Sequence, residues 1–103
     1  MTSKLFILMK SPWACPDCTD MNLVLGVKGN DRVGIILFED AAYFAAHKEM
    51  AARLSPVMDE IFVMRDDLEA RGFGDSVPEG FRVIDYPEAV DMIFEYDKTI
   101  TVW

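Results

Sequence analysis

The two cysteines, Cys15 and Cys18, are the residues of this chain best suited to covalent chemistry. They stand in a Pro-punctuated turn that follows an apolar run, Lys4–Lys10, and this run is typical of a buried strand. In α/β proteins, reacting groups gather at the carboxyl ends of parallel strands, where the following helix points free N–H groups into the crevice. The spacing therefore predicts a thiol site at the end of the first strand.

A persulfide or redox thiol must ionise, and an anion at a helix N-terminus is stabilised by the free N–H groups and the helix dipole. Cys18 fits this position best, whereas Cys15 lies earlier in the turn. The neighbouring Asp17 and Asp20 oppose thiolate formation, which Lys10 would offset by folding back. Two thiols in a Cys-Pro-Asp-Cys turn can also close a disulfide, or one can release a product from the other. Sulfur transfer, redox chemistry and two inert cysteines all remain open interpretations.

Other candidate groups have simpler explanations. The cysteine pair supplies only two metal ligands and His47 lies far away on an Ala-rich stretch, so we expect no metal and no cofactor. His47 is interpreted as a helix-surface residue. The acidic pairs Glu39-Asp40 and Asp66-Asp67 follow expected strands, where catalytic carboxylates can lie, but helix capping is enough to explain them. Packing in the core or at a subunit interface is the interpretation for three aromatic residues, Trp13, Tyr86 and Trp103.

Length and charge narrow the classes of function. The 103 residues are enough for a single domain, 1–103, and 18 acidic against 10 basic residues give a net charge of −8. This balance argues against nucleic-acid binding, which needs clustered Lys and Arg. No apolar stretch is long enough to span a membrane, and the N-terminal run lacks the features of a signal peptide. We therefore expect a cytoplasmic protein, in which a close cysteine pair favours redox, sulfur-carrying or metal-binding roles over a structural disulfide.

Alternating strand and helix patterns define the expected fold. A strand over 32–38 precedes a helix over 41–54 with Asp40 as its N-cap, and a helix over 65–72 has Asp66 in the cap position. Pro87 opens another helix in which Val90, Ile93 and Phe94 share a face. The pattern predicts a three-layer α/β/α fold with a mainly parallel five-stranded sheet of undetermined strand order. The remaining expected strands are the initial run and residues 61–64, 81–84 and 99–103, and a further helix is expected between Cys18 and Gly29.

Five short motifs follow one another along the chain: the Lys10-Ser11-Pro12 turn, Phe38-Glu39-Asp40, Asp67-Leu68-Glu69-Ala70-Arg71-Gly72, Val83-Ile84-Asp85-Tyr86, and Asp97-Lys98 before Trp103. Together they resemble the DsrH/TusB family. The order, spacing and short total length are similar to that family over nearly the whole chain. The resemblance implies a DsrE/F/H-like fold and a small subunit of the DsrEFH or TusBCD sulfur-relay complex. In such complexes persulfide sulfur passes between cysteines, toward tRNA 2-thiouridine synthesis or dissimilatory sulfur metabolism.

The resemblance also implies partners and a specific departure. It implies hetero-oligomers with DsrE/TusD-like and DsrF/TusC-like subunits, in which TusB-type members act mainly as scaffolds and the partner TusD carries the sulfur. The DsrH-type cysteine falls near Met21 or Asn22, and neither position is a cysteine here. Cys15 and Cys18 are thus candidate auxiliary sulfur acceptors. The alternative is a stand-alone thiol redox or persulfide carrier, because the Cys15-Pro16-Asp17-Cys18 turn is also similar to that of glutaredoxin and thioredoxin.

Overall fold

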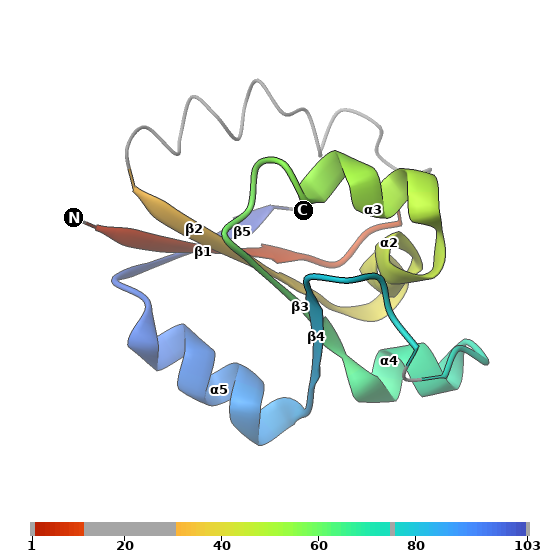
Figure 1. The fold of residues 1–103 in the computed structure, drawn as a ribbon. Helices are drawn as coiled ribbons and strands as arrows, with labels where there is room; N and C mark the ends of the chain where they lie inside the picture. Colours follow the sequence, from red (N-terminus) through yellow and green to blue (C-terminus); the bar gives the residue numbers. More distant parts are fainter. Residues whose placement is uncertain (1, 12–30, 75, 103) are drawn as a thin grey trace.

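A five-stranded sheet forms the centre of the computed structural model, which describes residues 2–11, 31–74 and 76–102. Every pairing between neighbouring strands is parallel, and the strand order is β4-β3-β2-β1-β5 (Figure 1). The predicted parallel α/β sheet is confirmed, and the structure supplies the order that alternation alone left open. The strands are β1 (Ser3–Leu8), β2 (Arg32–Leu37), β3 (Glu60–Met64), β4 (Phe81–Ile84) and β5 (Lys98–Val102).

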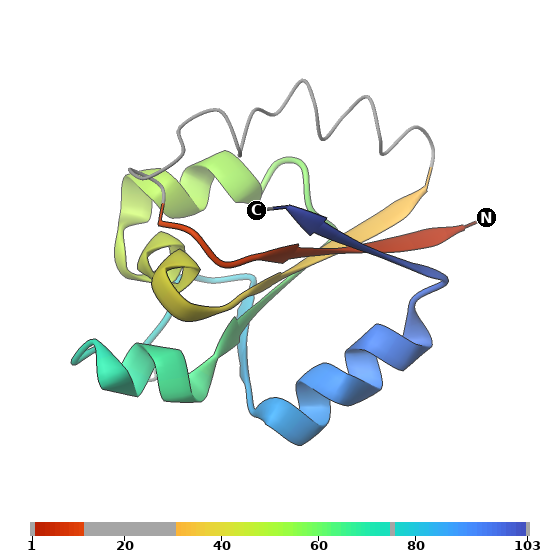
Figure 2. The same cartoon turned by 180° about the vertical axis from the view of Figure 1, so that it is seen from behind.

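Helices cover both faces of the sheet. Helix α5 (Tyr86–Glu95) lies against one face, and α2 (Tyr43–Ala46) with α3 (Lys48–Leu54) lies against the other, as both views show (Figures 1 and 2). Because successive strand residues point to opposite faces, the strands contribute to two separate apolar clusters. Phe6, Ile35 and Val63 face α2 and α3, whereas Ile36 and Phe62 face α5. The predicted three-layer arrangement therefore holds.

The segment after β2 differs from the single helix predicted over 41–54. It begins with a 3₁₀ turn, η2 (Glu39–Ala42), and continues as α2 and α3, which are separated at His47 by an extended backbone. The break lets each piece bury its own apolar residues against the sheet, including Phe44 before it and Leu54 after it. The predicted N-cap Asp40 is also wrong, because Phe38 occupies the cap position and makes no side-chain cap hydrogen bond.

Helix α4 (Arg65–Ala70) forms where a helix over 65–72 was predicted, but its start differs. Met64 is the N-cap and no side chain caps the helix, so the predicted cap role of Asp66 is wrong. The C-terminal end follows the expectation. Gly72 takes the left-handed conformation, with φ of 77°, while its N–H donates to Glu69 O and Phe73 N–H donates to Leu68 O. These paired bonds are a Schellman motif, and they close the helix at the predicted glycine.

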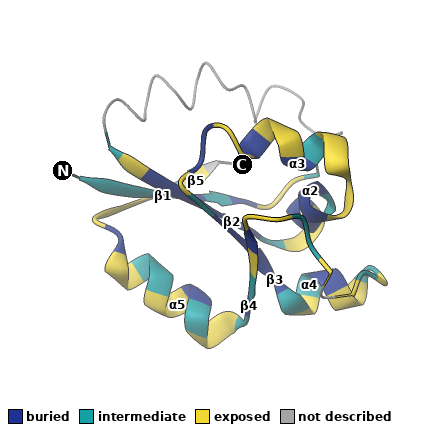
Figure 3. Cartoon of the chain, viewed as in Figure 1, coloured by how far each residue is buried: buried dark blue, intermediate teal, exposed yellow. Residues whose placement is uncertain are grey.

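Helix α5 has the most complete local signals in the chain. Asp85 accepts a hydrogen bond from Glu88 N–H, the Glu88 carboxylate accepts one from Asp85 N–H, and Pro87 stands in the first turn. The face predicted to be shared by Val90, Ile93 and Phe94 is divided, because Ala89 and Ile93 pack on the sheet while Val90 and Phe94 are exposed. Figure 3 shows the outer side of α5 as largely exposed.

Candidate functional site

Strand β1 precedes both cysteines in the sequence and ends at the carboxyl edge of the sheet. Strand β1 ends at Leu8 in the interior of the sheet, and Leu8 O accepts a 2.9 Å hydrogen bond from Phe38 N–H. The chain after β1 goes on to β2, whereas the chain after β4 crosses to β5 on the opposite side of β1. Such a reversal is the switch point at which α/β sheets form their binding crevices. The predicted thiol residues themselves, Cys15 and Cys18, lie outside the described residues.

An ion-pair network orders the chain beside this edge. Arg71, at the end of α4, donates from Nη2 to Asp40 Oδ1 at 2.7 Å and from Nη1 to Asp67 O at 3.1 Å. Asp67 Oδ2 accepts a 2.8 Å hydrogen bond from Glu39 N–H. Glu39 has a φ of 48°, a left-handed conformation that non-glycine residues seldom adopt. Contacts from α4 thus hold the backbone that follows β2 in a strained conformation.

This network explains one member of each acidic pair at the strand ends, Asp40 and Asp67. Asp40 and Asp67 are bound to Arg71 across two elements, and the Asp40 carboxylate raises the pKa of the Arg71 guanidinium. Their role here is to join η2 to α4, so they do not cap their own helices. His47 is exposed, as predicted, and its ring lies beside Tyr43 with centroids 6.4 Å apart. Within the described residues, no group of three or more His, Cys, Asp or Glu side chains is arranged to hold a metal ion.

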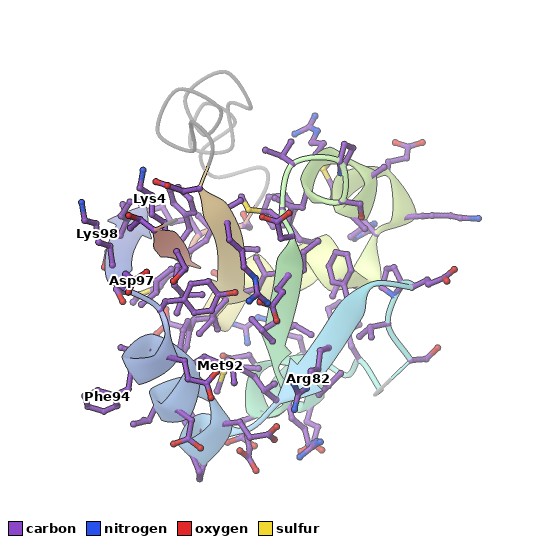
Figure 4. All side chains as sticks on the ribbon, turned by 60° about the vertical axis from the view of Figure 1, so that its left-hand side comes forward. Lys4, Arg82, Met92, Phe94, Asp97 and Lys98 are labelled. Carbon is purple, nitrogen blue, oxygen red and sulfur yellow. The ribbon has the colours of Figure 1, made fainter. Side chains whose placement is uncertain are left out.

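A pocket of about 440 Å³ opens at the opposite, amino edge of the sheet. Its lining comes from the starts of β1, β2 and β3, from Arg82 on β4 and from the end of α5, and Figure 4 labels two of the lining residues, Arg82 and Met92. Its charged side chains are largely paired, because Arg32 binds Glu60 and Arg82 Nη2 lies 3.3 Å from Glu88 Oε2. Sequence inspection missed this pocket, since its residues are far apart in the chain and form no motif. The lining residues are Ser3, Arg32, Glu60, Arg82, Met92, Glu95 and Tyr96.

Tyr96 attaches the end of α5 to the sheet at this pocket. Its ring lies over Gly34, where an added Cβ would be 2.9 Å from Tyr96 Cζ. Its hydroxyl donates a 2.7 Å hydrogen bond to Glu60 Oε1. Burial raises the pKa of the Tyr96 hydroxyl, and the hydrogen bond to Glu60 raises it further. Only a glycine on β2 leaves room for this ring, so residues 34 and 96 form a matched pair.

Two further contacts fasten the same edge. Asp97 Oδ2 accepts hydrogen bonds from Ser3 N–H at 2.8 Å and Ser3 Oγ at 3.1 Å, and Ser3 Oγ accepts one from Asp97 N–H. These bonds lower the pKa of the Asp97 carboxyl, the backbone bond most. Lys4 Nζ lies 2.7 Å from Asp31 Oδ2, and this hydrogen bond lowers the pKa of Asp31. Short polar contacts at the amino edge therefore join β1 to the segments before β2 and β5.

The fold defines a three-layer α/β protein with a parallel sheet, and both cysteines stand in the sequence between β1 and β2. Comparison with protein families gives a match to DsrH, the DsrH-like protein family, over residues 10–99. The chain belongs to the DsrH family. Among solved structures, the ychN protein from E. coli is similar with a TM-score of 0.79 and 14% identity, over 98% of this chain and 99% of that one. That likeness concerns the fold, and the curated proteins gave no match.

Family membership supports a general role for this chain as a subunit in sulfur relay, as the sequence resemblance implied. Among the residues that the structure describes, no helix is sufficiently long and apolar to cross a membrane.

Proposed function

We propose that the chain is a subunit of a cytoplasmic persulfide sulfur-relay complex, assembled with DsrE/TusD-like and DsrF/TusC-like subunits. The complex serves tRNA 2-thiouridine synthesis or dissimilatory sulfur metabolism. The observation that carries this proposal is the match to the DsrH family over residues 10–99, which covers most of the chain. The chain acts mainly as a structural subunit and is a component of a sulfurtransferase rather than a complete enzyme.

Cys15 and Cys18 are proposed as auxiliary sulfur acceptors. The support is their place in the sequence: both cysteines follow β1, which ends at the switch point of the sheet. A thiolate of either residue would attack the outer sulfur of a donor persulfide, forming a new S–S bond while the donor leaves as its thiolate. The second cysteine could then attack the first, releasing hydrosulfide and leaving a disulfide. These two reaction steps account for every sulfur atom and need only the donor persulfide.

Co-expression with DsrE-like and DsrF-like subunits from the same source tests the assembly. We expect a complex that survives affinity purification through a tag on this chain, with defined stoichiometry by native mass spectrometry. A chain that purifies alone beside well-folded partner subunits would contradict the proposed function. The variant Cys15→Ser/Cys18→Ser is the matched control, because a structural subunit should assemble without either thiol.

Sulfur transfer is tested by exposing the purified, reduced chain to a persulfide donor and measuring peptide masses. Gain of one sulfur atom on the peptide containing Cys15 and Cys18 is the expected result, and the double Ser variant should gain none. No gain, with both thiols still open to alkylation, would remove the acceptor role and leave a scaffold. Sulfur transfer by the isolated chain at the rate of the complex would instead favour the alternative, a stand-alone carrier that uses the same turn.

A further inference from the structure

Helix α5 presents an apolar stripe to solvent. Tyr86, Val90 and Phe94 are spaced four residues apart, so they follow one another along a single side of the helix. Their exposed fractions are 52%, 50% and 84%. The one other large apolar residue that is exposed among the described residues is Met9, at 40% on the carboxyl edge. Figure 4 shows Phe94 pointing away from the sheet, while Met92 points toward it. Exposed apolar residues that gather in this way mark interaction sites more often than scattered ones.

The stripe is held on a rigid support. The Asp85–Glu88 capping box fixes the start of α5, and the Tyr96 hydroxyl fixes its end through Glu60. The inner side of the helix is already occupied, because Ala89 is buried and Ile93 packs against the sheet. The outer stripe therefore plays no part in the core of this chain. A preordered helix loses little conformational freedom on binding, which favours a helix-in-groove contact.

The charges around the stripe select the partner. Helix α5 contains three carboxylates, Glu88, Asp91 and Glu95, and neither Lys nor Arg. Arg82, the basic residue on the neighbouring strand β4, is paired with Glu88. Two copies of this chain meeting through α5 would bring their acidic side chains together, at a cost from like-charge repulsion. A partner with Lys or Arg around an apolar groove would complement both the stripe and its margins.

We propose that the outer face of α5, centred on Phe94 and Val90, is the surface by which this chain docks into a basic-rimmed apolar groove of a different protein subunit. This inference rests on the proposed function, which it deepens by naming the contact face and the chemistry of the partner. Phe94 supplies the apolar anchor, and Asp91 and Glu95 pair with the basic rim. The pocket beside Arg82 and Met92 adjoins this face, so the contact can extend toward β4.

The test uses this chain with the co-expressed DsrE-like and DsrF-like subunits. We expect Phe94→Ala to weaken assembly at least tenfold, measured as the Kd between the purified chain and its partners. Val90→Ser should weaken it less, and Asp91→Lys/Glu95→Lys should weaken it and reduce its dependence on salt concentration. Met9→Ala is the matched control, an exposed apolar residue outside the stripe, and should leave the Kd unchanged. Unfolding curves should show that Phe94→Ala keeps its fold, because most of that side chain lies in solvent.

The outcomes separate this inference from the function on which it rests. If the wild-type chain binds neither subunit, the proposed function fails and the docking proposal falls with it. If assembly occurs but Phe94→Ala binds as tightly as wild type, only the docking proposal is overturned. A photo-crosslinker placed at position 94 should attach to an apolar segment of the partner that is flanked by Lys or Arg. Attachment to a second copy of this chain, or to an acidic segment, would also overturn the proposal.

Discussion

The two faces of the sheet are built differently. Against one face, η2, α2 and α3 expose no large apolar side chain, and their buried residues join the larger of the two described clusters. Against the other face, α5 contributes a smaller cluster, a polar contact between Tyr96 and Glu60, and an outer stripe of exposed apolar residues. If α5 served only to pack against the sheet, Phe94 would be expected to face inward, since burying an aromatic side chain is strongly favourable. The difference indicates that one face is packed for stability and the other also for contact with a partner.

The largest expected effects compare a buried Phe on each face. Phe44 on α2 and Phe62 on β3 are both fully buried, one in each cluster. Substitution of either by Ala should cost about 3–5 kcal/mol in free energy of unfolding, through lost burial and the cavity left behind. Urea denaturation measures this. Near-equal losses would show that both clusters carry the fold, whereas a loss below about 1 kcal/mol for Phe62→Ala would show that the α5 face is dispensable.

The fit between α5 and the sheet is tested at Gly34. An alanine Cβ would clash with the Tyr96 ring, so Gly34→Ala should destabilise the chain by about 1–3 kcal/mol. Gly74→Ala is the matched control, because nothing lies within 4 Å of its added Cβ, and it should change stability by less than about 0.5 kcal/mol. Adding Tyr96→Phe to Gly34→Ala removes the nearest clashing atom, so the double variant should lose less than the sum of the two single variants. Strict additivity would mean that the two residues do not share this contact.

The contribution of the Tyr96 hydroxyl to the free energy of unfolding should decline at alkaline pH. Tyr96→Phe removes its hydrogen bond to Glu60 and should cost about 1 kcal/mol at neutral pH. Because burial raises the pKa of Tyr96, its stabilisation is complete below the unfolded tyrosine value of about 10 and declines as the pH rises above it. Stability curves of the two proteins should therefore converge above about pH 10. A difference that stays constant to high pH would contradict the raised pKa.

The smallest expected effect concerns the exposed contact between Asp97 and Ser3. Its hydrogen bonds lower the pKa of Asp97, so their contribution is present above the unfolded aspartate value of about 3.9 and disappears as the pH falls through the lower folded value. Asp97→Asn should be less stable than wild type at pH 7 and equally stable in strong acid. Urea unfolding at a series of pH values checks this, with Asp91→Asn on the outer side of α5 as the control.

Much of the fold could be predicted because its signals are local. The strand over 81–84 and the stop at Gly72 follow from a short apolar run and from a residue that tolerates positive φ. The errors arose where a contact crosses between elements. Asp40 looked like a cap in the sequence, but Arg71 binds it from α4, and Asp67 supplies the bond that orders Glu39. No spacing rule within one helix contains that information.

The candidate sites also differ in whether their residues are close together in the sequence. The cysteine turn is visible in the sequence because both thiols lie within four residues, whereas the amino-edge pocket joins residues from Ser3 to Tyr96. The sequence predicted a face of α5 shared by Val90, Ile93 and Phe94, and helical periodicity did not fix which part of that arc would pack on the sheet. In the structure Ile93 packs on the sheet, whereas Val90 and Phe94 are exposed. Which side of α5 faces the sheet depends on Tyr96 and Gly34, which fit together only after the strands have assembled.

The alternation of strands and helices, the α/β class and the resemblance to the DsrH family could all be predicted from the sequence, because each depends on local pattern or on motif order. Tertiary structure alone decided the strand order, the break at His47 and the outward direction of Phe94. These depend on the free energy of packing between distant segments, in which a helix rotates to fit the surface available to it. At Gly34, that surface is shaped by the lack of a single side chain.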